Sequence, residues 1–244
     1  KNKKIKIPVY VSAGQEFIAS TIATICNLKK IKPLIFGQHR CHSTYLTFGG
    51  DKSKLIDELL QRETGCTRGM GGSASIHSEK INMYGHDGLM GSNGPIGVGA
   101  CYATKKPTII FLGDASAEED YVFSSIGWAA TKNLPILFVV EDNNLSILTE
   151  KKVRRSWEMS EVAKSFGIKA SFDVCDSLDS LLSVVTEINP KETSFLNIRS
   201  ERICWHAGSG TNEGVYDRLK DESKEFPGII ERAKLDNKKI WDTV

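Results

Sequence analysis

The sequence predicts an α/β protein with a doubly wound, mostly parallel sheet and helices on both faces. The two segments TIIFL (108–112) and PILFVV (135–140) are almost continuously apolar, as expected of strands buried on both sides. A helical pattern separates them, and strand–helix–strand order is that of a parallel βαβ unit. The length of 244 residues and hydrophobic fraction of 40% are enough for one substantial core.

The other elements follow from hydrophobic periodicity in chain order. Before the two strands, a helix is expected from Gly14, a short strand at 34–36 and a helix over 51–63. A helix over 95–104 leads into the first long strand, and helix, strand, helix and strand follow over 157–166, 170–174, 177–188 and 195–198. Between Gly65 and Gly91 no period is sustained, and the density of Gly, Ser, His and Asn favours an ordered loop near a ligand. We expect a single domain over 1–244, in which 207–244 forms a C-terminal loop and helical tail.

Composition and charge argue against several classes of function. Lys and Arg number 32 against 30 Asp and Glu, a formal charge of +2 that gives no electrostatic case for nucleic acid. The 6 cysteines include no CxxC pair, which argues against a zinc site and a disulfide framework and favours reduced thiols. No run approaches the roughly 18 apolar residues of a membrane span, and no signal peptide is apparent. We therefore expect a soluble cytoplasmic protein.

Polar residues follow both long strands at the point where each strand ends. Asp114 comes directly after the first strand and Asn143 shortly after the second. Carboxyl ends of parallel strands meet at one edge of the sheet, so both side chains should reach the same crevice. Mg²⁺ prefers hard oxygen ligands such as these. Either motif alone is more often turn or helix-cap chemistry, and the pair is what indicates a metal site.

The motifs of two common nucleotide sites are missing. Neither GxxxxGK[ST] nor GxGxxG between a strand and a helix occurs, which argues against a P-loop and a Rossmann site. The segment GDASAEEDYVFSSIGWAATKNLPILFVVEDNN, Gly113 to Asn144, instead resembles the thiamine diphosphate signature, which opens with Gly-Asp-Gly and closes with Asn-Asn.

The resemblance extends to the α subunit of the E1 component of 2-oxo acid dehydrogenases, of which this chain looks like a short, divergent member. The segments that carry it, in order, are AGQEF (13–17), HRCH (39–42), GCTRGMGGSASIH (65–77), GLMGSNGPIGVGA (88–100) and LPILFVVEDNN (134–144). It spans roughly residues 14–206. The resemblance implies thiamine diphosphate and Mg²⁺ as cofactors.

The same resemblance implies roles for individual residues. The metal ligands would be the side chains of Asp114 and Asn143 and the main-chain carbonyl of Leu145. His42 and His206 are the candidate catalytic residues. Arg40 and His206 would face the diphosphate, and the carbonyl of Met90 would accept a hydrogen bond from the aminopyrimidine. The full set of expected cofactor-binding residues is His39, Arg40, Gly88, Met90, Gly113, Asp114, Ala115, Ser116, Asn143, Leu145 and His206.

The resemblance also implies a partner chain. In this family the glutamate that pairs with the cofactor's aminopyrimidine belongs to a β subunit, so we expect an α2β2 heterotetramer and an inactive isolated chain. A lipoyl E2 component is a further expected partner. Departures from the family pattern include Ala115 in place of the third glycine and His39 where tyrosine is common.

Three functions remain open from the sequence. The first is E1-type decarboxylation of a 2-oxo acid with acyl transfer. The second is a split transketolase-like or carboligating enzyme acting on sugar phosphates or 2-oxo acids. The third is a non-catalytic regulator that keeps the fold, against which the joint presence of Arg40, Asp114 and Asn143 argues.

Overall fold

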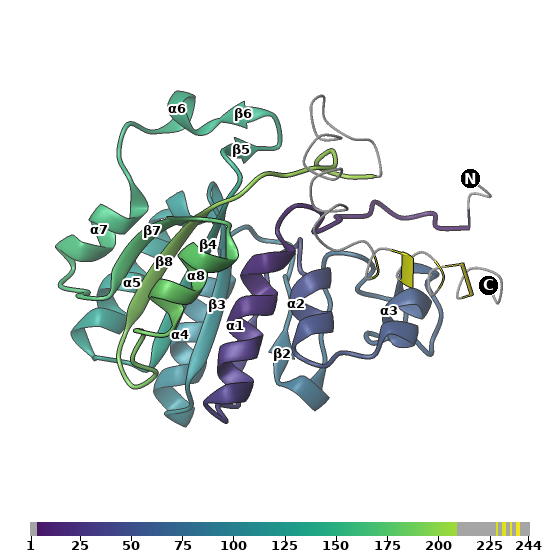
Figure 1. Ribbon diagram of the computed structural model, residues 1–244, viewed down its shortest axis with the longest axis horizontal. Coiled ribbons are helices and arrows are strands. Elements are labelled where there is room, and N and C mark those ends of the chain that lie inside the picture. Colours follow the sequence, from purple (N-terminus) through teal and green to yellow (C-terminus); the bar gives the residue numbers. More distant parts are fainter. Residues whose placement is uncertain (1–3, 209–227, 229–230, 233–234, 236–237, 240–244) are drawn as a thin grey trace. The chain divides into compact units, whose positions relative to one another are not determined.

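The computed structural model describes residues 4–208 together with Gly228, Glu231, Arg232, Leu235, Lys238 and Lys239 (Figure 1). The chain divides into one compact unit from Lys1 to Ser209 and a second from Gly210 to Val244. The loop and helical tail expected over 207–244 lie almost wholly outside the described residues.

Six strands of this unit form one parallel sheet in the order β2-β1-β3-β4-β8-β7. The strands are β1 (Leu34–Phe36), β2 (Met83–Tyr84), β3 (Thr108–Gly113), β4 (Ile136–Asp142), β7 (Ser171–Cys175) and β8 (Ser194–Arg199). A separate antiparallel hairpin pairs β5 (Leu145–Ser146) with β6 (Thr149–Glu150). The predicted parallel α/β sheet is confirmed.

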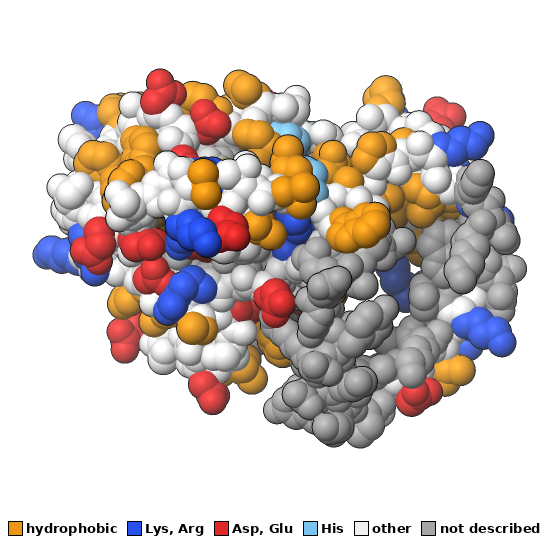
Figure 2. Space-filling model, turned by 90° about the horizontal axis from the view of Figure 1, so that it is seen from above, with side chains coloured by type: hydrophobic (Ala, Val, Ile, Leu, Met, Phe, Trp, Pro, Cys, Tyr) orange, Lys and Arg blue, Asp and Glu red, His pale blue; other side chains and the backbone are white. Residues whose placement is uncertain are grey.

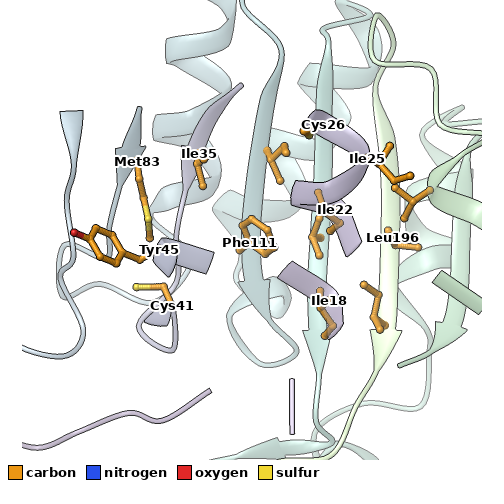
Figure 3. Close-up of a cluster of buried hydrophobic side chains, with 14 of the residues drawn as sticks. Ile18, Ile22, Ile25, Cys26, Ile35, Cys41, Tyr45, Met83, Phe111 and Leu196 are labelled. Atoms are coloured by element: carbon orange, nitrogen blue, oxygen red, sulfur yellow. The ribbon is translucent and has the colours of Figure 1, made fainter. Parts of the chain in front are cut away.

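Helices cover both faces of the sheet because every long strand is apolar on both sides. One face carries α1 (Glu16–Leu28), α2 (His42–Thr47) and α8 (Leu178–Val185), and the other carries α4 (Asn93–Thr104), α5 (Asp120–Thr131) and α7 (Met159–Ser165) (Figure 1). Along β3, Phe111 packs into the first core cluster and its neighbours Ile110 and Leu112 into the second. Figure 3 shows the first cluster, where Ile18 and Ile22 of α1 lie over the strands.

The Gly-rich loop over 65–72 is ordered, as predicted, but a side chain of this chain orders it. The helix expected over 51–63 ends earlier, as α3 (Lys52–Leu59), and its residue Glu58 is fully buried. The Glu58 carboxylate accepts hydrogen bonds from the backbone N–H groups of Thr67 (2.7 Å), Gly69 (2.9 Å), Gly71 (2.8 Å) and Gly72 (3.0 Å). These amides therefore face Glu58 and not a ligand.

The remaining short elements connect the sheet to its surroundings. They are η1 (Glu79–Ile81), η2 (Ser116–Glu118) and α6 (Lys151–Arg154). All six cysteines are free, which agrees with the expected absence of disulfides. Among the described residues, no helix combines the length and apolarity needed to cross a bilayer.

The strand order reverses direction between β1 and β3. From β1 the chain moves outward to the edge strand β2, and from β3 it moves the opposite way to β4, although β1 and β3 are neighbours. In open α/β sheets, ligands bind at the carboxyl ends of the strands beside such a reversal. The topology therefore indicates where a site should lie before any side chain is considered.

Candidate functional site

A cavity of about 190 Å³ opens at the carboxyl edge of the sheet, beside the reversal between β1 and β3. Its lining comes from the segments that follow β1, β3, β4 and β8, with one residue from the loop before α4. Figure 2 looks down on this edge and shows histidine side chains, in pale blue, near the middle of the view. The lining residues are Gln38, His39, Arg40, Met90, Gly113, Asp114, Ala115, Ser116, Asn143, Leu145, Ser146, Ile147, Arg202 and His206.

Most of the expected cofactor-binding residues line this one cavity. Two candidates do not: His42 and Gly88 are absent from the lining. Sequence reasoning missed four lining residues, Gln38, Ser146, Ile147 and Arg202. Gln38 and Arg202 lie just after β1 and β8, so the rule that ligands bind beyond strand ends was the signal that could have found them.

Asp114 follows β3 directly and is 2% exposed. Its Oδ2 accepts a hydrogen bond from Arg154 Nη2 at 2.5 Å. Burial raises the pKa of the Asp114 carboxyl, and the Arg154 hydrogen bond opposes that shift. The next residue, Ala115, has φ −76° and ψ −38°. Alanine therefore replaces the family glycine here without backbone strain.

Asn143 follows β4, and its side chain shapes the turn that comes next. Its Oδ1 accepts the backbone N–H of Leu145 at 3.1 Å, and its Nδ2 donates to Gln15 Oε1 at 3.4 Å. Lys151 supports the turn from outside through a 2.7 Å ion pair with Asp142. The amide oxygen and the start of β5 thus stay close to Asp114 at the same sheet edge, where both line the cavity.

Two buried arginines supply positive charge to the cavity. Arg40 donates to the carbonyl of Val11 (2.9 Å) and to that of His206 (3.1 Å). Burial, together with the charge of Arg202, lowers the pKa of Arg40 to about 10, so the guanidinium stays charged at neutral pH. Arg202 donates to the Cys204 carbonyl at 3.1 Å and to the Ile147 carbonyl at 2.9 Å, which ties the β5–β6 hairpin to the segment after β8.

Three histidines and a tyrosine gather beside Arg40. The ring of His39 lies 5.1 Å from that of Tyr10, 5.5 Å from that of His206 and 6.0 Å from that of His86, centroid to centroid. Burial and the charge of Arg40 lower the pKa of His39 to about 3, and the same causes lower the pKa of His206. Both imidazoles are therefore neutral at physiological pH, when each can donate one hydrogen bond.

His42 lies apart from this group, at the start of α2. Its Nε2 is 2.8 Å from Ser73 Oγ and 3.2 Å from the Ser73 carbonyl. Burial lowers the pKa of His42 to about 4. These contacts join α2 to the Gly-rich segment, and His42 does not line the cavity described above.

The loop before α4 approaches the cavity at Met90. Gly91 has φ +80°, and a Cβ there would lie 2.7 Å from the Ser116 carbonyl oxygen, so glycine is required for this close approach. Gly88 also has a positive φ, but nothing lies within 4 Å of its Cβ position. The carbonyl of Met90 accepts a hydrogen bond from the Tyr121 hydroxyl.

The donor set of the cavity fits a metal-bound diphosphate. Asp114, Asn143 and the Leu145 carbonyl offer hard oxygens on one side, and Arg40 and Arg202 offer positive charge to anionic oxygens. Among the described residues no group of three or more His, Cys, Asp and Glu could hold a metal. A single carboxylate with neutral oxygens suits Mg²⁺, which keeps water and phosphate oxygens in its shell. Within the described structure neither ring nitrogen of His39 makes a hydrogen bond, although both are buried.

Comparison with known proteins places the chain in a family. The family model described as dehydrogenase E1 component matches residues 1–181. A relative from Rickettsia felis, the pyruvate dehydrogenase E1 component subunit alpha, is 28% identical over 242 residues, which cover 92% of this chain and 72% of the relative. The protein of the same name from Rickettsia bellii is 31% identical over 225 residues, 87% of this chain and 67% of the relative. The mitochondrial pyruvate dehydrogenase E1 component subunit alpha of Schizosaccharomyces pombe is 33% identical over 169 residues, which cover 67% of this chain and 40% of the relative. With its sheet, its cavity and these matches, the chain belongs to the dehydrogenase E1 component family.

Proposed function

We propose that this chain is the cofactor-anchoring α subunit of a two-chain thiamine diphosphate enzyme that decarboxylates a 2-oxo acid. The observation that carries the proposal is the cavity at the strand-order reversal, where oxygen donors face buried arginines. The relatives bear the name pyruvate dehydrogenase, so pyruvate is the first substrate to test. The cofactor supplies the electron sink for cleavage of the bond to the carboxylate.

The residues of this chain would bind and orient the cofactor. Asp114, Asn143 and the Leu145 carbonyl would hold Mg²⁺, and Arg40 would pair with diphosphate oxygens through its fork of N–H donors. His39 and His206, neutral because partial burial beside arginine lowers their pKa values, would donate to the same oxygens without adding charge. Arg202 would hold the hairpin that carries Leu145 and Ile147.

A second chain would complete the site. Asp114 is the one acidic residue among the described residues that line the cavity, and it is assigned to the metal. Glu141 is not available for this role, because its side chain is fully buried, accepts a hydrogen bond from Gln38 and does not line the cavity. A carboxylate for the proton chemistry of the aminopyrimidine must then come from the β subunit. We propose an α2β2 assembly that passes its acyl group to a lipoyl carrier.

The cofactor claim is tested by calorimetry on the complex of this chain with its β subunit. Thiamine diphosphate should bind in Mg²⁺ and fail to bind in excess chelator. Asp114→Ala removes the one carboxylate ligand and should weaken binding by at least about 100-fold. Asp120→Ala, which removes an exposed acid at the start of α5, should bind as the wild type does. Unchanged binding in Asp114→Ala would overturn the metal assignment.

The reaction claim is tested separately with the reconstituted complex. Pyruvate and other 2-oxo acids are offered with an artificial electron acceptor, and ketose phosphates are offered with an aldose acceptor. The proposal expects decarboxylation of a 2-oxo acid that depends on the cofactor and on both chains. Turnover of ketose phosphates alone would support the transketolase-like reading instead. Binding without turnover of either class would support a regulatory role.

A further inference from the structure

Arg154 forms an ion pair with Asp114, the carboxylate that the proposed function assigns to the metal. It ends α6, beyond the β5–β6 hairpin, and its side chain is 13% exposed. Its Nη2 lies 2.5 Å from Asp114 Oδ2 and 3.1 Å from Glu118 Oε1. We propose that Arg154 is a counter-cation to Asp114 with which Mg²⁺ competes for this carboxylate when it binds. This inference rests on the proposed function.

The buried charge of Asp114 has a cost in free energy. Asp114 is 2% exposed, and a carboxylate that has left water requires an opposite charge close by. Arg154 is the cation in direct contact with the Asp114 carboxylate among the described residues. Arg155 touches only the backbone carbonyl of Asp114, at 3.1 Å. Arg154 therefore offsets part of the cost of burying this carboxylate.

A metal ion bound to Asp114 makes the contact between Arg154 and Asp114 unfavourable. A divalent ion on Asp114 supplies the opposite charge itself and repels a guanidinium a few ångströms away. The Asp114 side chain uses Oδ2 for Arg154, so the two cations compete for one small anionic group. Mg²⁺ then binds at the expense of the Arg154–Asp114 pair, and that pair lowers the apparent affinity for the metal.

Arg154 has a second acidic partner, Glu118, besides Asp114. Its Nε also donates to Glu118, at 3.2 Å to Oε1, so release of Asp114 does not leave the guanidinium unpaired. Arg155, whose side chain is fully buried, holds Glu118 in place at 2.8 Å. Arg154 Nη1 donates to the Thr149 carbonyl at 2.7 Å. The same side chain thus links the state of Asp114 to the hairpin that carries Leu145 and Ile147.

The test is a Mg²⁺ titration of the complex with its β subunit, at a fixed, saturating concentration of thiamine diphosphate, followed by calorimetry. In Arg154→Gln the metal concentration at half-saturation should fall on the order of tenfold, the factor expected for losing one charge-assisted hydrogen bond. Without metal, the melting temperature of this variant should lie below that of the wild type. The increase in melting temperature on adding Mg²⁺ and cofactor should be larger in the variant. Lys152→Gln removes the same charge from an exposed position of the same helix. This control should change neither the metal concentration at half-saturation nor the melting temperatures.

Arg154→Lys serves as a second variant if the glutamine variant folds poorly. Lysine keeps the charge but not the fork that spans both carboxylates, so a smaller tightening in the same direction is expected. Half-saturation at an unchanged or higher metal concentration in the variant would overturn the inference. A wild-type complex that binds no cofactor with Mg²⁺ would instead overturn the proposed function, and this inference with it.

Discussion

At the scale of single residues, the cavity separates two kinds of chemistry. Asp114 and Asn143 bring oxygens after β3 and β4, and Arg40 and Arg202 bring charged N–H donors after the flanking strands β1 and β8. His39, which also lines the cavity, is neutral because burial beside Arg40 lowers its pKa to about 3. A site of this composition attracts an anion that already carries a metal.

Two histidines with strongly lowered pKa values should make the folded protein less stable in acid. Their pKa values, about 3 for His39 and about 4 for His42, lie below the ordinary 6.5, so the folded chain binds fewer protons than the unfolded chain. The free energy of unfolding should therefore fall as pH decreases from 6.5 towards 4, by up to about 1.4 kcal/mol per pH unit for each histidine. His42→Asn should flatten this slope in urea unfolding followed against pH. Identical slopes in both proteins would show that His42 is not the cause.

The sequence predicted the cavity-lining residues that carry a motif and missed those that do not. Asp114 and Asn143 stand at the ends of strongly apolar strands, so their positions follow from the pattern alone. Arg154 sits in a run of charged residues after the signature, which has the composition of a solvated surface. Only the fold shows that α6 turns this side chain back onto Asp114 and Glu118.

At the scale of elements, the loop over 65–72 shows how one side chain can organise a segment without regular structure. Its backbone N–H groups converge on Glu58 at the inner face of α3. Gly65 and Gly71 are packed too tightly for a Cβ, which explains the glycines without any ligand. The loop forms part of the support for α2 through the contact between Ser73 and His42.

Removal of the Glu58 charge should therefore loosen this loop. Glu58→Gln places an amide NH₂ group where N–H donors converge, and it should lower the free energy of unfolding by about 3 kcal/mol. Thermal and urea unfolding measure the effect. Glu63→Gln, at an exposed position of the same segment, is the matched control and should be neutral. Equal stability of the two variants would show that the converging amides contribute little.

Element types were predictable where periodicity was strong. The long strands β3 and β4 agree with the predicted segments within two residues, because continuous apolar runs bounded by turn residues have few alternatives. The edge strand β2 has two residues and lies in a segment without a period. The hairpin of β5 and β6 is held by Arg202, 55 residues away from the Ile147 carbonyl to which it donates. Such elements follow from tertiary contacts and not from local pattern.

At the scale of the molecule, one parallel sheet brings distant segments to a common edge. Residues after β1, β3, β4 and β8 meet because β1 and β3 mark the reversal of strand order. The described lining of this cavity holds a single carboxylate, and the proposal assigns that group to the metal. The central claim is thus that this chain anchors the cofactor and a second chain activates it.

The most direct measurement of that claim is a crystal structure of the complex with thiamine diphosphate and Mn²⁺ in place of Mg²⁺, with anomalous data to locate the metal. The account predicts one anomalous peak at about 2.2 Å from oxygens of Asp114, Asn143 and the Leu145 carbonyl. Arg154 should be displaced from Asp114, and the diphosphate should lie against Arg40. A bound cofactor whose metal lies elsewhere, with Arg154 still paired to Asp114, would contradict it.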